Sequence, residues 1–202
     1  MTGIVLAGGK SRRMGQDKAQ LRLCGRTLLE LQTEKLRLLG TDEILISGAP
    51  QLPGTRAVPD RFPGCGPLAG LEACLREAGS ETCVILCVDV PLVPVSLLRE
   101  LIRVQRRTGC DAAIAEHGGV WEPLIGVYRS ALAGRAESLL REDRRSVRAL
   151  LERTDTRLVS FPGDARLLLN CNAPEDYARL LELCKPERGA EILNTAPKIS
   201  DP

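Results

Sequence analysis

A run of glycines and cations follows the first apolar stretch of the chain. Leu6, Ala7, Gly8 and Gly9 lead into a basic loop that ends at Lys18. Paired glycines have no Cβ, so their backbone N–H groups can approach a ligand closely and bind phosphate oxygens. The pattern predicts a phosphate-binding loop to which Lys18 adds charge. A plain glycine turn with solvated cations is the alternative interpretation.

Two aspartates follow later extended stretches. Asp89 ends the most apolar stretch, residues 82–89, and ligands bind at the carboxyl ends of strands in open α/β sheets. Mg²⁺ prefers oxygen ligands and uses only one or two protein carboxylates, so we predict Asp89 as its ligand. Asp60 precedes a loop rich in glycine and proline and could accept hydrogen bonds from a base or a ribose. The alternatives are a helix cap for Asp89 and a solvated side chain for Asp60.

Two asparagines stand two residues apart near the end of the chain, Asn170 and Asn172. On an extended segment, side chains at this spacing point to one face. An amide both donates and accepts hydrogen bonds, which suits a polar heterocycle or a phosphate. Asn172 could equally cap the helix that is predicted to begin at Pro174.

These residues need a scaffold, and the hydrophobic pattern predicts one. Apolar runs of strand length alternate with longer segments of helical period, which indicates an α/β fold of three layers, α/β/α and Rossmann-like, with a mostly parallel central sheet. Residues 120–128 are expected to form an antiparallel strand at the sheet edge. Residues 1–185 are predicted to form one domain, followed by a tail at 186–202. The other predicted strands are residues 2–7, 43–47, 56–59, 82–89, 111–115, 157–161 and 166–169, and the predicted helices are 27–39, 68–78, 95–107, 130–141, 146–152 and 174–183.

Composition excludes several classes of function. The net charge is +2 and aromatic residues are only 2% of the 202, which argues against a protein that stacks on nucleic-acid bases. No window approaches the roughly 20 apolar residues of a membrane span. The eight cysteines form no Cys-x-x-Cys pair and the chain has one histidine, His117, so a histidine-based zinc site is excluded. We expect free, mostly buried thiols in the reducing cytoplasm.

The string from Leu6 to Lys18 resembles the nucleotide-binding signature of the molybdenum cofactor guanylyltransferases and their nucleotidyltransferase relatives. The resemblance extends from Thr2 to about Cys184. Four further segments carry it: residues 58–71 with Asp60 and Gly-Pro-Leu-Ala-Gly, residues 87–94 around Asp89, residues 121–128, and residues 169–176 with Asn-x-Asn-x-Pro-Glu-Asp.

The resemblance implies a reaction and roles for the residues. GMP would pass from GTP to the terminal phosphate of molybdopterin, pyrophosphate would leave, and Mg²⁺ would be the cofactor, with Lys18 and Asp89 as catalytic residues. Molybdoenzymes or other proteins of the cofactor pathway are the implied partners. The implied nucleotide contacts are Leu6, Ala7, Gly8, Gly9, Lys18, Asp60 and Asp89, and the implied acceptor contacts are Asn170 and Asn172.

The chain departs from the family pattern at three positions. Val88 and Val90 flank Asp89 where the family usually reads Cys-Asp-x-Pro, and Ser47 stands where some members carry an asparagine that touches the nucleotide. Sibling enzymes that use CTP typically read Leu-Ala-Ala-Gly instead of Leu-Ala-Gly-Gly, which favours GTP. A cytidylyltransferase, a sugar-phosphate nucleotidyltransferase and a non-catalytic accessory protein for molybdoenzyme maturation remain alternatives.

Overall fold

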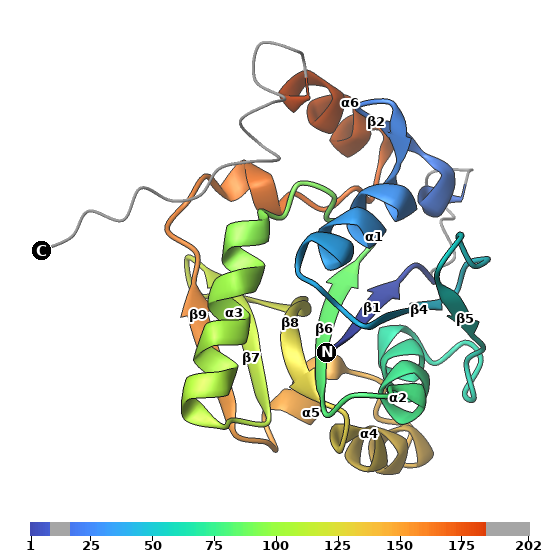
Figure 1. Cartoon of the computed structure of the whole chain (residues 1–202), viewed down its shortest axis with the longest axis vertical. Coiled ribbons are helices and arrows are strands. Elements are labelled where there is room, and N and C mark those ends of the chain that lie inside the picture. The colour runs from blue at the N-terminus through green and yellow to red at the C-terminus, as the bar shows by residue number, and fades with distance from the viewer. Residues whose placement is uncertain (9–16, 185–202) are drawn as a thin grey trace, which may run out of the picture.

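The computed structural model describes residues 1–8 and 17–184, and a seven-stranded sheet forms its middle layer (Figure 1). The strand order is β5-β4-β1-β6-β8-β7-β9, which places β6, formed by the most apolar stretch of the sequence, at the centre. All of these strands run in one direction except β8, which is antiparallel to both of its neighbours. The strands are β1 (Thr2–Leu6), β4 (Glu43–Ser47), β5 (Arg56–Val58), β6 (Thr82–Cys87), β7 (Ala112–His117), β8 (Val120–Arg129) and β9 (Thr156–Ser160).

The position of β8 corrects one prediction. The strand is antiparallel as expected, but it lies inside the sheet between β6 and β7 and not at the edge. Gly118 and Gly119 both have positive φ, at 58° and 83°, and make a two-residue turn that pairs His117 with Val120. Such a turn returns the chain directly alongside β7, and the second side of β8 then pairs with β6. The edges of the sheet are β5 and β9 instead.

Helices cover both faces of the sheet, which gives the predicted three layers. Helices α1 (Leu28–Leu38) and α3 (Val95–Thr108) contribute to one apolar cluster, and α2 (Pro67–Glu77), α4 (Leu132–Arg141) and α5 (Val147–Leu151) to another. In residues 1–8 and 17–184, no helix is long and apolar enough to cross a bilayer.

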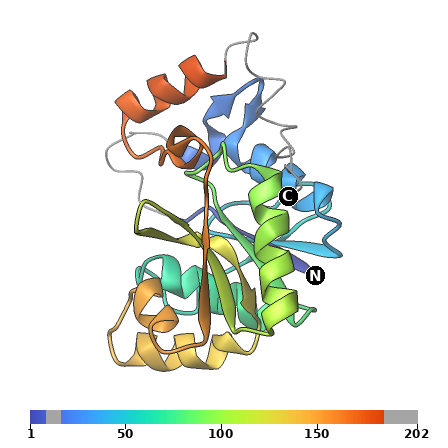
Figure 2. The same cartoon turned by 90° about the vertical axis from the view of Figure 1, so that its left-hand side faces the viewer.

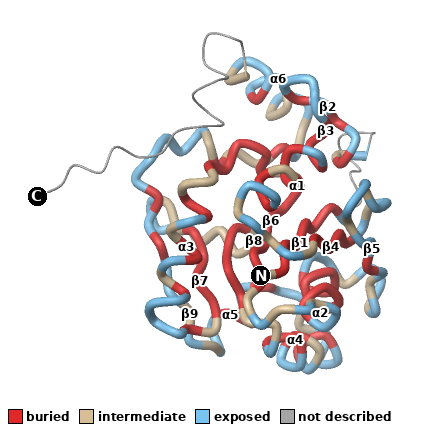
Figure 3. Tube along the Cα trace, viewed as in Figure 1, coloured by how far each residue is buried: buried red, intermediate tan, exposed pale blue. Residues whose placement is uncertain are grey.

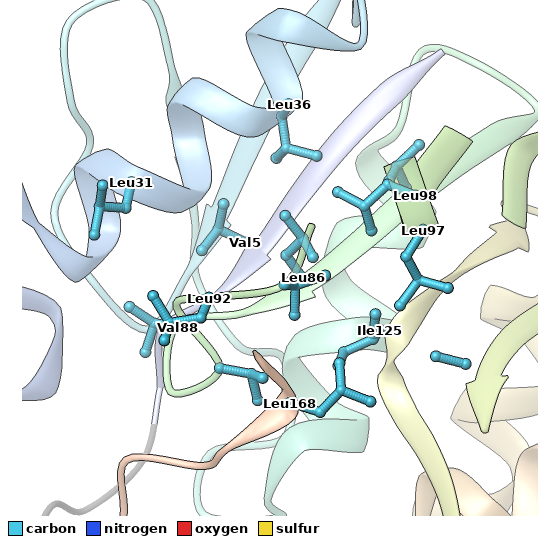
Figure 4. Close-up of a cluster of buried hydrophobic side chains, with 14 of the residues drawn as sticks. Val5, Leu31, Leu36, Leu86, Val88, Leu92, Leu97, Leu98, Ile125 and Leu168 are labelled. Carbon is cyan, nitrogen blue, oxygen red and sulfur yellow. The ribbon is translucent and has the colours of Figure 1, made fainter. Parts of the chain in front are cut away.

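The two clusters are separated by the sheet because neighbouring side chains of a strand point to opposite faces. Val5 belongs to the cluster beneath α1 and α3, whereas Ile4 and Leu6 belong to the other. Figure 3 shows the central strands as buried and the outer surfaces of the helices as largely exposed. Figure 4 shows the first cluster, in which Val88 and Leu92, from the loop after β6, pack with Val5 and Leu31.

A short hairpin and the last helix complete the described chain. Strands β2 (Arg22–Leu23) and β3 (Arg26–Thr27) pair with each other, and helix α6 (Pro174–Leu183) lies beside them (Figure 2). The Tyr177 hydroxyl donates to the Arg22 carbonyl oxygen over 2.5 Å. Neither this hairpin nor the 3₁₀ turn at Lys18–Gln20 was predicted.

The strand predicted at residues 166–169 is wrong. Residues Ala165–Leu168 form a 3₁₀ helix, because the Asp164 carboxylate accepts from the Arg166 N–H at 2.9 Å and closes a turn. The predicted tail at 186–202 lies outside the described residues.

Candidate active site

The predicted site residues at the ends of β1, β5 and β6 lie at the carboxyl end of the sheet, beside the end of β4. Leu6 is in register with Ser47 of β4 on one side and with Cys87 of β6 on the other. Connections from β1 leave toward β4 and return to β6 on its other side, so this is a topological switch point, where α/β sheets bind ligands. Gly8 and Asp89 each lie just beyond the strand that precedes them. These residues lie close together because each follows a parallel strand, and the parallel strands end on the same side of the sheet.

Lys18 joins two of the predicted residues. Its Nζ lies 3.6 Å from Asp89 Oδ2 and donates to Asn172 Oδ1 at 2.7 Å. The Lys18 and Asp89 side chains are only 16% and 21% exposed, so solvent screens this pair less than a surface ion pair. The three side chains come from segments that are far apart in the sequence. One ammonium thus holds two oxygen atoms at the carboxyl edge of the sheet.

Asp89 has an oxygen atom that could hold a metal ion. Its Oδ1 is buried and has no hydrogen-bond partner among the described residues. A buried carboxylate oxygen without a partner is costly, and a hard cation that takes oxygen ligands would satisfy it. Asn172 Oδ1, an amide oxygen of an exposed residue, accepts from the same Lys18 ammonium and could supply a second oxygen ligand. The donor set fits a magnesium ion that is completed by phosphate oxygens.

Asn172 reaches Lys18 because its backbone is fixed by the start of α6. Asp176 Oδ2 accepts from the N–H groups of Asn172 and Ala173, both at 3.0 Å. The aspartate therefore caps the helix, and the Asn172 side chain is free to bind Lys18. Just before it, the Cys171 N–H donates to the Asp89 carbonyl oxygen at 2.7 Å. Asn170 is half-buried and has no hydrogen-bond partner among the described residues, so the structure does not join it to this cluster.

Glu122 of β8 is a second acidic group near Asp89 that sequence reasoning missed. Its pKa is raised, mainly by burial and then by the negative charge of Asp89, while His117 acts in the opposite direction. Because β8 is antiparallel to β6, its first residues extend past the carboxyl end of β6. The prediction that residues 120–128 form an antiparallel strand could have identified Glu122, because the start of such a strand lies at the end of the sheet where parallel strands finish.

Cys87 is not a nucleophile in this site. Burial and the nearby Asp89 carboxylate hold the pKa of its thiol well above the usual value. A thiol in such surroundings stays protonated, and only the thiolate attacks. Among the described residues, the polar groups gathered around this thiol are the ammonium of Lys18 and the oxygen atoms of Asp89 and Asn172.

Asp60 is oriented by Ser47. The Ser47 hydroxyl donates to Asp60 Oδ1 at 2.8 Å, and Ser47 itself is buried. Gly70 of α2 packs directly on this pair, and a Cβ at that position would lie 2.3 Å from Ser47 Oγ. The glycine of the Gly-Pro-Leu-Ala-Gly segment is therefore required by the close approach of α2. The hydroxyl at position 47, a departure from the family pattern, acts on Asp60.

Gly8 is packed against the turn after β4. Gly48 has φ of +80°, and a Cβ there would lie 2.1 Å from the Gly8 Cα. The Ala7 N–H donates to the Ser47 carbonyl oxygen at 2.8 Å. These contacts fix the beginning of the predicted phosphate loop. Gly9, the other predicted glycine, lies outside the described residues.

Comparisons with known proteins identify the family of the chain. Residues 3–158 match the family model described as MobA-like NTP transferase domain. The chain is 39% identical over 191 residues to a probable molybdenum cofactor guanylyltransferase of Opitutus terrae, covering 89% of this chain and 94% of that protein. It is 34% identical over 194 residues to a protein of the same description from Carboxydothermus hydrogenoformans, covering 91% and 96%.

A solved structure supports the same assignment. The molybdopterin-guanine dinucleotide biosynthesis protein A of Archaeoglobus fulgidus superposes with a TM-score of 0.77 at 28% identity, covering 91% of this chain and 98% of that one. The predicted α/β class is thereby confirmed. Both the family model and the near full-length relatives point to one assignment. The chain belongs to the MobA-like NTP transferase family and is a nucleotidyltransferase.

Proposed function

We propose that the protein transfers GMP from GTP to the terminal phosphate of molybdopterin, releasing pyrophosphate and forming molybdopterin guanine dinucleotide. The observation that carries the proposal is the cluster of Lys18, Asp89 and Asn172, in which one ammonium holds a carboxylate and an amide oxygen at the switch point. The names of the relatives and of the matched structure supply the substrate class.

The chain's own groups bind and orient the triphosphate. The Lys18 ammonium can exchange its contact with Asp89 for phosphate oxygens. The N–H groups of Gly8 and Gly9 would also bind the triphosphate, whereas Leu6 and Ala7 would line the nucleotide site, because the Ala7 N–H already donates to the Ser47 carbonyl oxygen. Asp89, with Asn172 beside it, would hold Mg²⁺, which when bound offsets charge between nucleotide and acceptor. In phosphoryl and nucleotidyl transfer, positioning and charge stabilisation account for most of the catalysis.

No proton needs to be removed from the nucleophile. The terminal phosphate of molybdopterin is already ionised at neutral pH, so it can attack the α-phosphate in line without a general base. We assign Asn172, which accepts from Lys18, and Asn170 to the acceptor side. The protonated Cys87 thiol is consistent with direct displacement, since it offers no covalent intermediate.

Asp60 is the proposed contact to the guanosine part of GTP. Ser47 engages one carboxylate oxygen of Asp60 and leaves the second for N–H groups of the base or hydroxyls of the ribose. The Watson–Crick edge of guanine offers two neighbouring donors to a carboxylate, whereas that of cytosine places its donor next to an acceptor. Asp60 therefore favours GTP over CTP.

Pyrophosphate release tests this function. Purified protein would be incubated with Mg²⁺, molybdenum-loaded molybdopterin, and GTP, CTP or ATP in separate reactions. We expect release with GTP alone and its loss in Asp89→Asn. Release with CTP would overturn the base assignment but keep the reaction. Binding of GTP without release from any nucleotide would favour an accessory protein over an enzyme.

The proposal extends to the compartment and the partners. All eight cysteines are free, and five of them are buried, which is typical of a protein of the reducing cytoplasm. The product would pass to molybdoenzymes or to other proteins of the cofactor pathway. Co-purification of the chain with a molybdoenzyme from reduced cell extract would test the second statement.

A further inference from the structure

Two polar side chains of α1 bind the loop that carries Asp89. Gln32 Nε2 donates to the carbonyl oxygens of Cys87 at 2.6 Å and Val90 at 2.9 Å. Lys35 Nζ donates to the Pro91 carbonyl oxygen and, at 3.0 Å, to Gln32 Oε1. The two side chains thus form one connected unit that holds three carbonyl groups on either side of Asp89.

Both side chains are buried, Gln32 at 0% and Lys35 at 3% exposure. Burial lowers the pKa of Lys35 to about 7, which reflects a large desolvation cost for its charge. The neutral amine has two N–H donors and the ammonium three, so Lys35 can serve its two acceptors in either state. Burying a lysine and a glutamine costs free energy of desolvation unless their polar atoms find partners. They need a compensating role, which the loop carbonyls supply.

The loop itself has few backbone partners of its own. Residues 88–91 follow the last residue of β6, so their carbonyl groups have no neighbouring strand to pair with. A buried carbonyl oxygen without a donor costs free energy, and the Gln32–Lys35 unit supplies these donors. Two further hydrogen bonds hold the loop: the Val88 N–H donates to the Leu6 carbonyl oxygen, and the Cys171 N–H donates to the Asp89 carbonyl oxygen. The backbone around Asp89 is therefore held on every side.

We infer that Gln32 and Lys35 are positioning residues that hold the Asp89 carboxylate toward Lys18 and the metal. Their hydrogen bonds go to the backbone of residues 87–91 and to each other, and not to the Asp89 or Lys18 side chains, so they act through the backbone. The inference rests on the proposed function, because that function assigns Asp89 as the metal ligand. Loss of partners that orient a metal ligand typically lowers metal affinity or activity about 10–100-fold.

The test compares Gln32→Met and Lys35→Met with Thr33→Val. Thr33 is buried on the same helix, but its hydroxyl donates to the Leu29 carbonyl oxygen of α1 and does not touch the loop. The control therefore loses a buried hydrogen bond and keeps the loop contacts. Two readouts are independent of turnover: hydrogen exchange of the peptide spanning residues 86–92, and Mn²⁺ binding to the GTP complex by electron paramagnetic resonance.

We expect Gln32→Met to accelerate exchange in residues 86–92 and to weaken Mn²⁺ binding, each about tenfold, with a smaller effect in Lys35→Met. Thr33→Val should lose thermal stability without either change. Equal Mn²⁺ affinity in wild type, Gln32→Met and Lys35→Met would overturn the inference while the proposed function stands. A wild-type protein that does not bind Mn²⁺ with GTP would overturn both. If Gln32→Met does not fold, Lys35→Met decides the question.

Discussion

Replacing Gly70 with alanine should weaken GTP binding more than it weakens the fold. A Cβ at position 70 would lie 2.3 Å from Ser47 Oγ and 3.4 Å from Asp60 Oδ1. The Ser47 hydroxyl must then turn away, and its hydrogen bond to Asp60 is lost. Overpacking costs about 1–3 kcal/mol, whereas alanine inside a helix gains about 1 kcal/mol over glycine. The net loss of stability should therefore be about 0–2 kcal/mol.

The effect on the nucleotide should be larger. A hydrogen bond to a charged group contributes about 1.5–3 kcal/mol, so a misplaced Asp60 carboxylate should raise the KM for GTP roughly 10- to 100-fold. Steady-state pyrophosphate release over a GTP range measures this value, and urea unfolding measures stability. Gly134→Ala is the matched control, because Gly134 lies in α4 and a Cβ there meets no described atom within 4 Å.

A second substitution isolates the cause. In a Ser47→Ala background the clashing oxygen is gone and the Ser47 Cβ, at 3.1 Å, is the nearest remaining atom. Adding Gly70→Ala there should raise the KM by less than about threefold. An unchanged KM in the single variant Gly70→Ala would refute the reasoning. So would an equal increase in the presence and absence of the Ser47 hydroxyl.

Three further predictions concern the parts that hold the site together. Gly48→Ala should cost more than about 2 kcal/mol of unfolding free energy, since its Cβ would meet the backbone of Gly8 and its φ is positive. Gly40→Ala is the control, because Gly40 has φ of +71° and no described atom lies within 4 Å of its Cβ. It should lose only the free energy of the unfavourable backbone conformation, about 1 kcal/mol. Equal losses of unfolding free energy in the two variants would contradict us. Asp176→Ala removes the acceptor of the Asn172 and Ala173 N–H groups, so we expect a loss of about 1 kcal/mol in urea unfolding and a higher KM for both the acceptor and GTP, because Asn172 also binds Lys18. Unchanged KM values for both substrates would contradict us. Lys35 has its pKa lowered from 10.5 to about 7, so between those pH values the unfolded chain binds one proton more than the folded protein, and folding stability rises with pH. Below pH 7 both states are charged and the penalty is fully present. Relative to Lys35→Met, wild-type stability in urea should therefore increase above pH 7 by up to about 1.4 kcal/mol per pH unit, and a flat difference would refute the assignment.

The sequence predicted the edge of the sheet at which the site lies, because each motif is local to the end of a strand. Gly8 and Asp89 each follow an apolar run and Asp60 follows a short extended segment, and parallel strands bring such ends together without further information. The meeting of Lys18 with Asn172 was not predictable in this way. It depends on Asp176 capping α6 and on the Cys171 N–H binding the Asp89 loop. These contacts join segments far apart in the chain.

Two elements were predicted wrongly, β8 in its position and residues 166–169 in their conformation, and each error has a local physical cause. The Gly118-Gly119 turn brings β8 back beside β7, which leaves its other side open to β6. Hydrophobic period alone cannot distinguish an edge strand from an interior one when both are apolar. At residues 165–168 the apolar leucines resemble a strand, but the Asp164 side chain competes with strand pairing by binding the local backbone.

The sequence of α1 contained a sign of the Gln32–Lys35 unit, because polar residues occupy positions that the helical period assigns to the buried face. Leu28 and Leu31 lie on the buried stripe of α1, and the residues four positions later on that stripe are Gln32 and Lys35. Polar residues at apolar positions are expected to be solvated or to have buried partners, and here the partners are the carbonyl groups beside Asp89. A break in amphipathic period thus indicates which helix supports a catalytic loop. Apolar residues at these positions would suit the buried stripe of α1 but would leave the Cys87, Val90 and Pro91 carbonyl groups without these donors, so the loop and not the helix explains the two polar residues.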